Sequence, residues 1–189
     1  MNKLNKDFYQ KPALELVKDF LGKYLVFNSP KGRVSGMISD VEAYPAFTDN
    51  VSHGNKRTAR TEVMYREGGL VYVYLIYGIY HQFAVVVNKQ EIPEVIFIRG
   101  VIPDEGVEIM KQNFEKEVKK IKELTSRPGN LCKSFGITKE LYGADLTGEI
   151  IYIEDRGIII DPLKIKSTRR VGISKKLDGS DLPLRFYVG

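Results

Sequence analysis

The chain is short of the residue types on which several classes of protein depend. Its 189 residues include one cysteine, Cys132, and two histidines, His53 and His81. A single cysteine excludes an intrachain disulfide and suits a reducing compartment, and so few histidine and cysteine ligands argue against a zinc site. No acidic cluster indicates a magnesium site. The composition therefore argues against a zinc site and gives no positive indication of a magnesium site.

Long apolar runs are also missing. No run approaches the roughly 18 apolar residues of a membrane span, and no apolar stretch follows the first lysines, so neither a span nor a signal peptide is predicted. We expect a cytoplasmic protein with no membrane partner, associated with the nucleoid if the source is bacterial. The 29 Lys and Arg against 24 Asp and Glu, a net charge of +5, favour a polyanionic partner without identifying it.

Apolar periodicity and turn signals predict a single domain over residues 1–189, since 43% hydrophobic content suffices for one core. Strands are predicted at 24–27, 34–44, 71–77, 79–87 and 94–100, with mostly strand and turn after residue 149. Helices are predicted near 12–21, at 104–124 with Asp104 as its cap, and at 131–137. The polar segment 45–69 is long for an irregular connection, which indicates a functional loop.

The stretch VYVYLIYGIY, residues 71–80, places four tyrosines close together. Tyr72 and Tyr74 lie two apart and share a face of a strand, whereas Tyr77 beside Gly78 marks a turn. Tyrosine is common in half-buried sheets, which is the ordinary explanation for any one of them. Several together can also line a pocket that stacks a nucleobase, and a tyrosine at a turn can wedge into a duplex. The cluster therefore favours a base-handling site.

Glu42 lies between apolar residues of a predicted strand, where a carboxylate needs a partner. It is either a member of a structural ion pair or a general base that activates water and stabilises positive charge on a sugar. Arg99, which closes the apolar run EVIFI, is the candidate partner. The residues alone leave the roles of His53 and His81 undetermined. Four basic residues of segment 45–69 have the character of phosphate contacts: Lys56, Arg57, Arg60 and Arg66.

Seven short motifs occur in the order and approximate spacing of one known family. They are DVEAY, SHG, GGLVYVYLIYGIY, IRGVIP, LCKSFGI, RRVGI and PLRFYV. Together they resemble the alkyladenine (3-methyladenine) DNA glycosylase family, and the similarity runs from DFYQKPALELVKDFLGK at residue 7 to the C-terminus. One such motif would be weak evidence, but seven in register are strong.

The resemblance implies a base-excision enzyme. Such an enzyme flips a damaged purine out of double-stranded DNA and hydrolyses its N-glycosidic bond as a monomer, without metal, cofactor or strand cleavage. The fold that it implies is α+β (mixed α/β), with helices flanking a curved, largely antiparallel sheet similar to the C-terminal domain of methionyl-tRNA formyltransferases. A Tyr-bearing hairpin is expected to protrude from that sheet.

The resemblance also implies a role for each matching residue. Glu42 corresponds to the general base, Arg99 to an arginine that helps to place the attacking water, and the backbone of Val171 to a carbonyl that faces the water. This agrees with physical chemistry, because an anionic carboxylate stabilises the oxocarbenium-like sugar while it deprotonates water.

The matching aromatic residues are implied to hold the base and to replace it. Tyr44 on one side, with His53 and Tyr74 on the other, corresponds to the residues that sandwich the flipped base. Tyr77 corresponds to the side chain that fills the vacated space in the duplex. Alkylation at a ring nitrogen makes a purine cationic, hence a better leaving group and a better guest for aromatic rings.

Three positions depart from the family pattern. Ala84, at the base-binding site, stands where relatives usually have an asparagine associated with rejection of normal guanine. Thr61 replaces a common asparagine and Asn130 a usual lysine. We expect the first departure to affect selectivity and the other two to weaken DNA contacts.

Two alternatives remain from the sequence. One is a nucleic-acid-binding module that keeps the scaffold with weak or no catalysis, although a pocket carboxylate would only repel phosphate in such a module. The other is a hydrolase of free nucleosides or nucleotides, against which the basic loop and the wedge-like Tyr77 argue. The sequence does not determine whether 3-methyladenine, 7-methylguanine, hypoxanthine or ethenoadenine is removed.

Overall fold

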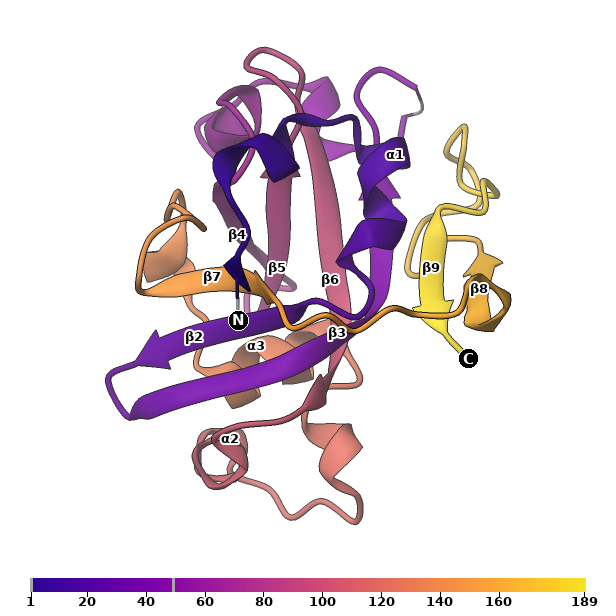
Figure 1. Cartoon of the computed structure of the whole chain (residues 1–189). Coiled ribbons are helices and arrows are strands. Elements are labelled where there is room, and N and C mark those ends of the chain that lie inside the picture. The colour runs from indigo at the N-terminus through magenta and orange to yellow at the C-terminus, as the bar shows by residue number, and fades with distance from the viewer. Residues whose placement is uncertain (1, 49) are drawn as a thin grey trace.

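Residues 2–48 and 50–189 are described by a computed structural model (Figure 1). Within them, nine strands form one sheet in the order β1-β7-β2-β3-β6-β5-β4, while β9 pairs with β3 and β8 with β9. The strand pairs are antiparallel, which confirms the predicted α+β fold with a largely antiparallel sheet. The strands are β1 (Asn2–Lys3), β2 (Tyr24–Ser29), β3 (Gly32–Tyr44), β4 (Val71–Ile76), β5 (Tyr80–Val87), β6 (Glu94–Pro103), β7 (Ile151–Asp155), β8 (Ile165–Thr168) and β9 (Arg185–Val188).

The helices are short. α1 (Ala13–Leu16) contacts β3 and β6, while α2 (Val107–Phe114) and α3 (Pro128–Phe135) pack on each other at the lower end of the molecule in Figure 1. α3 confirms the short helix predicted at 131–137. The remaining helical turns are 3-10 helices at Lys6–Gln10, Val17–Phe20, His53–Asn55, Glu62–Tyr65, Ile121–Leu124, Lys139–Leu141 and Pro162–Lys164.

The predicted helix near 12–21 is correct in place but not in form. α1 ends after one turn, and the 3-10 helix Val17–Phe20 continues it up to Gly22, whose φ is +86°. Leu14 is 50% exposed although it is apolar. The tighter helix turns Val17 and Phe20 into the core, where both are fully buried.

The long helix predicted at 104–124 is wrong. α2 ends at Phe114, because the next residue, Glu115, takes a left-handed conformation with φ +61°. Tertiary hydrogen bonds then decide the path of the chain. Thr125 donates its hydroxyl to the carbonyl of Val101 at 2.7 Å, and Ser134 donates to the carbonyl of Leu124 at 2.7 Å. A straight helix to residue 124 would not bring the hydroxyl of Thr125 to β6 and the carbonyl of Leu124 to α3.

Asp104 is not a helix cap either. Gly106, with φ +73°, precedes α2 instead. The Asp104 carboxylate accepts hydrogen bonds from the hydroxyl of Ser35 at 2.9 Å and from Arg156 at 2.6 Å. The side chain therefore joins the β6–α2 connection to β3 and to the end of β7.

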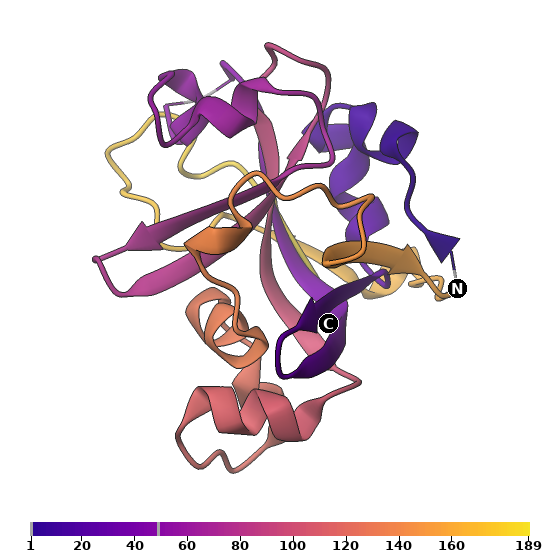
Figure 2. The same ribbon diagram turned by 90° about the vertical axis from the view of Figure 1, so that its left-hand side faces the viewer.

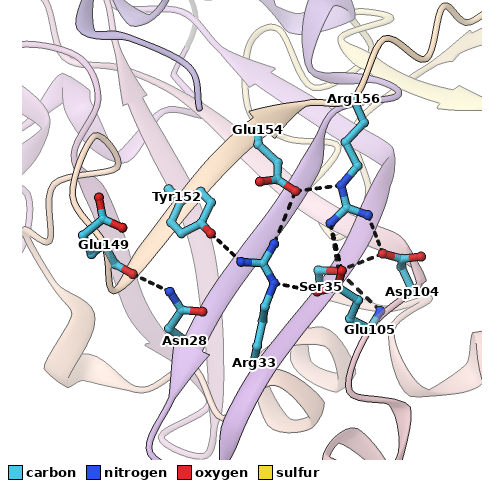
Figure 3. Close-up of polar contacts among 9 residues, drawn as sticks. All are labelled: Asn28, Arg33, Ser35, Asp104, Glu105, Glu149, Tyr152, Glu154 and Arg156. Carbon is cyan, nitrogen blue, oxygen red and sulfur yellow. Dashed lines mark hydrogen bonds and ion pairs between the residues drawn. The ribbon is translucent and has the colours of Figure 1, made fainter. Parts of the chain in front are cut away.

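Two guanidinium groups make this corner of the sheet a closed ionic network (Figure 3). Arg33 on β3 pairs with Glu105 and donates to the hydroxyl of Tyr152 at 2.6 Å. Arg156 pairs with Glu154 at 2.7 Å, and Glu154 lies 3.5 Å from Arg33. The cations and carboxylates satisfy one another, so this cluster has the character of a structural clamp.

Side chains alternate between the two faces of the sheet, and each face has its own buried cluster. On the face that the N-terminal helices and α3 cover, the larger cluster includes Val41, Ala43, Val71, Val73, Phe83, Val85, Ile96 and Ile98. On the opposite face, a smaller cluster contains Val63, Met64, Tyr72, Ala84, Val86, Val95 and Phe97. The candidate site is built on this second face.

Candidate active site

Strand register aligns the candidate residues across four strands of the second face. Tyr72 lies opposite Ala84, Ala84 opposite Phe97, and Phe97 opposite Glu42, so one row crosses β4, β5, β6 and β3. Residues two positions along these strands share the face. They are Tyr74, Gln82, Arg99 and Tyr44.

Glu42 is fully buried, and donors hold both of its carboxylate oxygens. Oε1 accepts a hydrogen bond from the backbone N–H of Val171 at 2.8 Å and lies 3.1 Å from Nη1 of Arg99. Oε2 accepts a hydrogen bond from the hydroxyl of Tyr44 at 2.9 Å. The expectation that Glu42 has a charged partner is confirmed, and this partner is Arg99.

A second ion pair flanks the first. Arg185 on β9 forms two hydrogen bonds with the carboxylate of Asp40, at 3.0 Å and 2.7 Å, and Arg99 lies 3.7 Å from the same carboxylate. Sequence reasoning missed Arg185, because only the pairing of β9 with β3 brings it here. The two carboxylates and two guanidinium groups give the cluster no net charge.

The environment opposes the ionised form of Glu42. Burial raises the pKa of this carboxyl group above its ordinary value of 4.5, while Arg99, the N–H of Val171 and the hydroxyl of Tyr44 counteract that rise. Burial, and next the charge of Glu42, raises the pKa of Tyr44 well above 10.0, so this phenol stays protonated and donates. A carboxylate with a raised pKa is a stronger base than an exposed one.

A cavity of about 430 Å³ opens in front of this cluster. Ligand pockets typically measure about 300–1,000 Å³. Glu42 does not itself line the cavity, but the three residues that hold it do, so the carboxylate lies directly behind the wall. The lining includes Tyr44, His53, Arg60, Tyr72, Tyr74, Tyr77, Gln82, Ala84, Phe97, Arg99 and Val171.

Uncharged aromatic rings form one side of the cavity. The rings of Tyr72 and Tyr74 stack with centroids 5.0 Å apart, and the ring of His53 meets Tyr74 edge-on at 4.9 Å. Nδ1 of His53 lies 3.2 Å from the hydroxyl of Tyr72. Burial raises the pKa of Tyr72 to about 12, while desolvation of the ring and then the charge of Arg60 lower the pKa of His53, so both are neutral near pH 7. Such walls suit a planar, electron-poor guest.

The hairpin between β4 and β5 extends away from the body of the molecule, at the left in Figure 2. At its tip Tyr77 has φ +53° and Gly78 has φ +73°. A left-handed conformation costs about 1–2 kcal/mol for a residue other than glycine. Tyr77 is nevertheless 85% exposed, and it also reaches the edge of the cavity. The predicted turn and protruding hairpin are confirmed.

Segment 45–69 contributes less to a DNA-binding surface than expected. The side chain of Thr61 is buried, and its hydroxyl donates to the carbonyl of Lys56 at 2.7 Å, so it shapes the loop and cannot touch DNA directly. Arg57 pairs with Glu62 and Glu91, each at 2.8 Å, and is largely neutralised. Arg60, by contrast, lines the cavity.

Asn130 also has a structural contact. Its amide donates to the carbonyl of Glu123 at 3.0 Å, which ties α3 to the preceding 3-10 helix. His81 is half-buried near the tip of the hairpin, opposite Leu75, and does not line the cavity. Over the described residues, no three His, Cys, Asp or Glu side chains gather where they could hold a metal ion. Within the same residues, no helix is both long and apolar enough to cross a membrane.

A buried carboxylate lies behind an aromatic cavity with a strained tyrosine at its rim, an arrangement whose shape suits a planar ring. Comparison with known proteins identifies the family. The methylpurine-DNA glycosylase (MPG) family model matches residues 7–189, and the chain belongs to this family.

Curated relatives match over nearly their whole length. A protein of Clostridium novyi (strain NT) is 37% identical over 100% of this chain and 96% of the relative. A protein of Alkaliphilus oremlandii (strain OhILAs) is 40% identical over 98% of this chain and 95% of the relative. A protein of Methanocella arvoryzae is 40% identical over 97% of this chain and 91% of the relative. Each carries the name "Putative 3-methyladenine DNA glycosylase".

Proposed function

We propose that this protein is a DNA glycosylase of base excision repair. In this proposal it flips alkylated purines out of duplex DNA and hydrolyses their N-glycosidic bonds. The family assignment supports the reaction class. The observation that carries the mechanism is Glu42, a buried carboxylate that the pocket residues Arg99, Tyr44 and Val171 hold just behind the cavity.

Hydrolysis follows from the chemistry of that carboxylate. A water attacks the anomeric carbon of the sugar, one of its protons passes to Glu42, and the C–N bond breaks with its electron pair going to the base. The sugar becomes oxocarbenium-like on the way, and the negative charge of Glu42 stabilises it. Arg99 and the N–H of Val171 occupy Oε1, so Oε2 is the oxygen that receives the proton.

Access to Oε2 requires a small change at Tyr44. The hydroxyl of Tyr44 is the group that covers Oε2, and Tyr44 also lines the cavity. In our proposal the attacking water shares or takes over this hydrogen-bond position when the base is bound. A carboxylate oxygen accepts two hydrogen bonds, so the exchange leaves no charge without a partner.

The aromatic walls select the guest. Tyr44 and the pair formed by Tyr74 and His53 come from different strands and loops, and all three border the cavity, as a sandwich around a base requires. An alkylated purine is cationic, and the neutral rings favour it over a normal base. Damaged purines also stack and pair poorly, which lowers the few kcal/mol needed for flipping.

Tyr77 is proposed to take the place of the flipped base. Its backbone is held in an unfavourable conformation at the tip of a hairpin, and its ring is exposed. Strain at an exposed aromatic residue is typical of a functional position. A phenol ring inserted between base pairs would keep the purine out of the stack.

The product is proposed to be an intact strand with an abasic site. A glycosylase that also cleaves the strand needs an amine nucleophile. No lysine is among the described residues that line the cavity.

The experiment that tests this function is base release from methylated duplex DNA without added metal. We expect free 3-methyladenine, with the strand breaking only after alkali treatment. Duplex binding without base release would instead support a binding module. Equal release from free nucleosides would support a nucleoside hydrolase.

A further inference from the structure

Gln82 is a polar residue of the pocket that neither holds Glu42 nor forms the aromatic walls. It lies on β5 opposite Tyr74 and two residues before Ala84, so both Gln82 and Ala84 face the cavity. Its exposed fraction is 6%. Among the lining residues that the structure describes, it is the one carboxamide.

A hydrogen bond to the backbone fixes the orientation of this amide. Nε2 of Gln82 donates to the carbonyl oxygen of His81 at 2.9 Å. A carbonyl oxygen can only accept, so the amide nitrogen must face His81 and Oε1 must face elsewhere. None of the described residues donates a hydrogen bond to Oε1 of Gln82. This oxygen is not among the fully buried polar atoms that lack a partner, so it is accessible to solvent. The cavity therefore contains a fixed acceptor without a partner.

The sheet places this acceptor opposite the reacting centre. β6 separates β5 from β3, so the strand of Gln82 lies two strand spacings, roughly 10 Å, from that of Glu42. A purine whose glycosidic nitrogen lay beside Glu42 and whose ring crossed β6 towards β5 would bring to Gln82 the edge far from that nitrogen, with N1 and the substituent at C6.

We propose, on the basis of the function proposed above, that Gln82 is a specificity-determining residue of this pocket. Oε1 accepts a hydrogen bond from an N–H on the far edge of the purine. 3-Methyladenine offers its 6-amino group, and 7-methylguanine and hypoxanthine offer N1–H. 1,N6-Ethenoadenine offers no donor there, because its bridge joins N1 to N6.

The damaged purines therefore fall into two groups: those that can donate a hydrogen bond to Gln82 and those that cannot. A base without the N–H leaves Oε1 desolvated and unpaired, which opposes binding. The pocket therefore selects lesions that keep a donor on this edge and disfavours ethenoadenine. Ala84, the neighbour of Gln82 on the same face of β5, has no polar side-chain atom that could take this role.

The test compares duplexes with a single hypoxanthine or a single ethenoadenine. Binding is measured by competition titration in the Glu42→Gln background, so that no base is removed during the measurement. Gln82→Met keeps the length of the side chain but removes the acceptor. We expect it to lower the ratio of hypoxanthine affinity to ethenoadenine affinity by about tenfold, the effect of one buried hydrogen bond. Gln90→Met makes the same change at an exposed position and should leave the ratio unchanged.

An unchanged ratio in Gln82→Met, or a ratio that already favours ethenoadenine before the substitution, would overturn the proposal. Release of 3-methyladenine by the otherwise unaltered protein is measured in parallel. Failure of that release would refute the proposed function, whereas the affinity ratio alone decides the role of Gln82.

Discussion

Two buried glutamates on adjacent strands of the same sheet have opposite surroundings. Glu94, at the start of β6, is 7% exposed and accepts from Ala13 N–H at 2.7 Å, from the amide of Asn88 at 3.0 Å and from Ala46 N–H at 3.2 Å. Glu42 is buried as deeply, but its partners are a guanidinium, a phenol and one N–H, and all three belong to residues that border a cavity.

The difference separates a structural carboxylate from one suited to chemistry. The neutral donors around Glu94 tie α1, β5 and the start of segment 45–69 to β6, and none of the residues that supply them lines the cavity. The phenol on Oε2 of Glu42 belongs to a residue that lines the cavity, and the cavity has room for a water. Burial alone therefore does not identify a catalytic acid or base, whereas the position of its partners beside a cavity does.

Apart from replacing Glu42 itself, removing the cation from its cluster is the change with the largest expected effect. Arg99→Leu should raise the pKa of Glu42 further, because Arg99 is the main group that opposes the effect of burial. We expect base release at neutral pH to fall by about a hundredfold. Because less Glu42 is ionised at a given pH, the rate profile should also move to higher pH. Single-turnover rates across a pH series would show this, and an unmoved profile would contradict the assigned role.

Tyr77→Ala should affect function without affecting the fold. The exposed ring supports no core, so the free energy of unfolding should stay near that of the wild type. The equilibrium constant for base flipping, measured through the fluorescence of a base analogue, should fall by about tenfold. The inserted ring would otherwise offset part of the few kcal/mol that unstacking costs. Overall duplex affinity should fall much less. Equal losses in the two titrations would argue against a wedge.

Glu94→Gln should show the reverse pattern. The new amide would face N–H donors that cannot accept a hydrogen bond. We expect a loss of about 1–3 kcal/mol of unfolding free energy, measured by urea denaturation, with base release retained in the folded protein. If the variant lost its activity but kept the unfolding free energy of the wild type, Glu94 would not be a structural carboxylate, and the two glutamates would not differ in role.

Glu42→Gln should change the stability in a way that depends on pH. The pKa of Glu42 is raised in the folded state, so its contribution to stability is fully present below its ordinary value of 4.5 and is lost as the pH rises through the folded pKa. Glutamine lacks this titration. The stability of the variant relative to the wild type should therefore increase as the pH rises from 4.5 through the folded pKa of Glu42. A difference that does not vary with pH would contradict the raised pKa.

Ala84→Asn should have the smallest effect, on selectivity alone. Ala84 lies in the same row as Glu42 and borders the cavity. An asparagine there should lower the background release of normal guanine by a few-fold, about the effect of one weak contact. Unchanged depurination of undamaged duplex DNA would show that this position does not control selectivity.

Local pattern was sufficient for much of the fold and singled out Glu42, Arg99 and the tyrosines, whereas His53 and Val171 came only from the resemblance to the family. Alternation gave β3 and the shared face of Tyr72 and Tyr74, and the glycine gave the turn at Tyr77. Apolar spacing misled at 104–124, because hydrogen bonds made by Thr125 and Ser134 override helical periodicity. Local propensity is a weak prior where tertiary contacts compete.

The contacts that the sequence could not predict join residues that are far apart in the chain. Val171 lies 129 residues from Glu42, and nothing near either residue indicates that one donates its N–H to the other. Gln82 was missed for the same reason, since only the register of β4 with β5 and the shape of the cavity reveal it. Thr61 was misjudged because an exposed loop was assumed to expose all its side chains.

The most direct test of the account measures single-turnover release of 3-methyladenine from methylated duplex DNA by the wild type, Glu42→Gln and Glu94→Gln. The account predicts a loss of about a thousandfold in Glu42→Gln, with duplex binding retained, and a near-normal rate in Glu94→Gln. Rapid release by Glu42→Gln, or equal loss in both variants, would contradict the assignment of Glu42 as the general base.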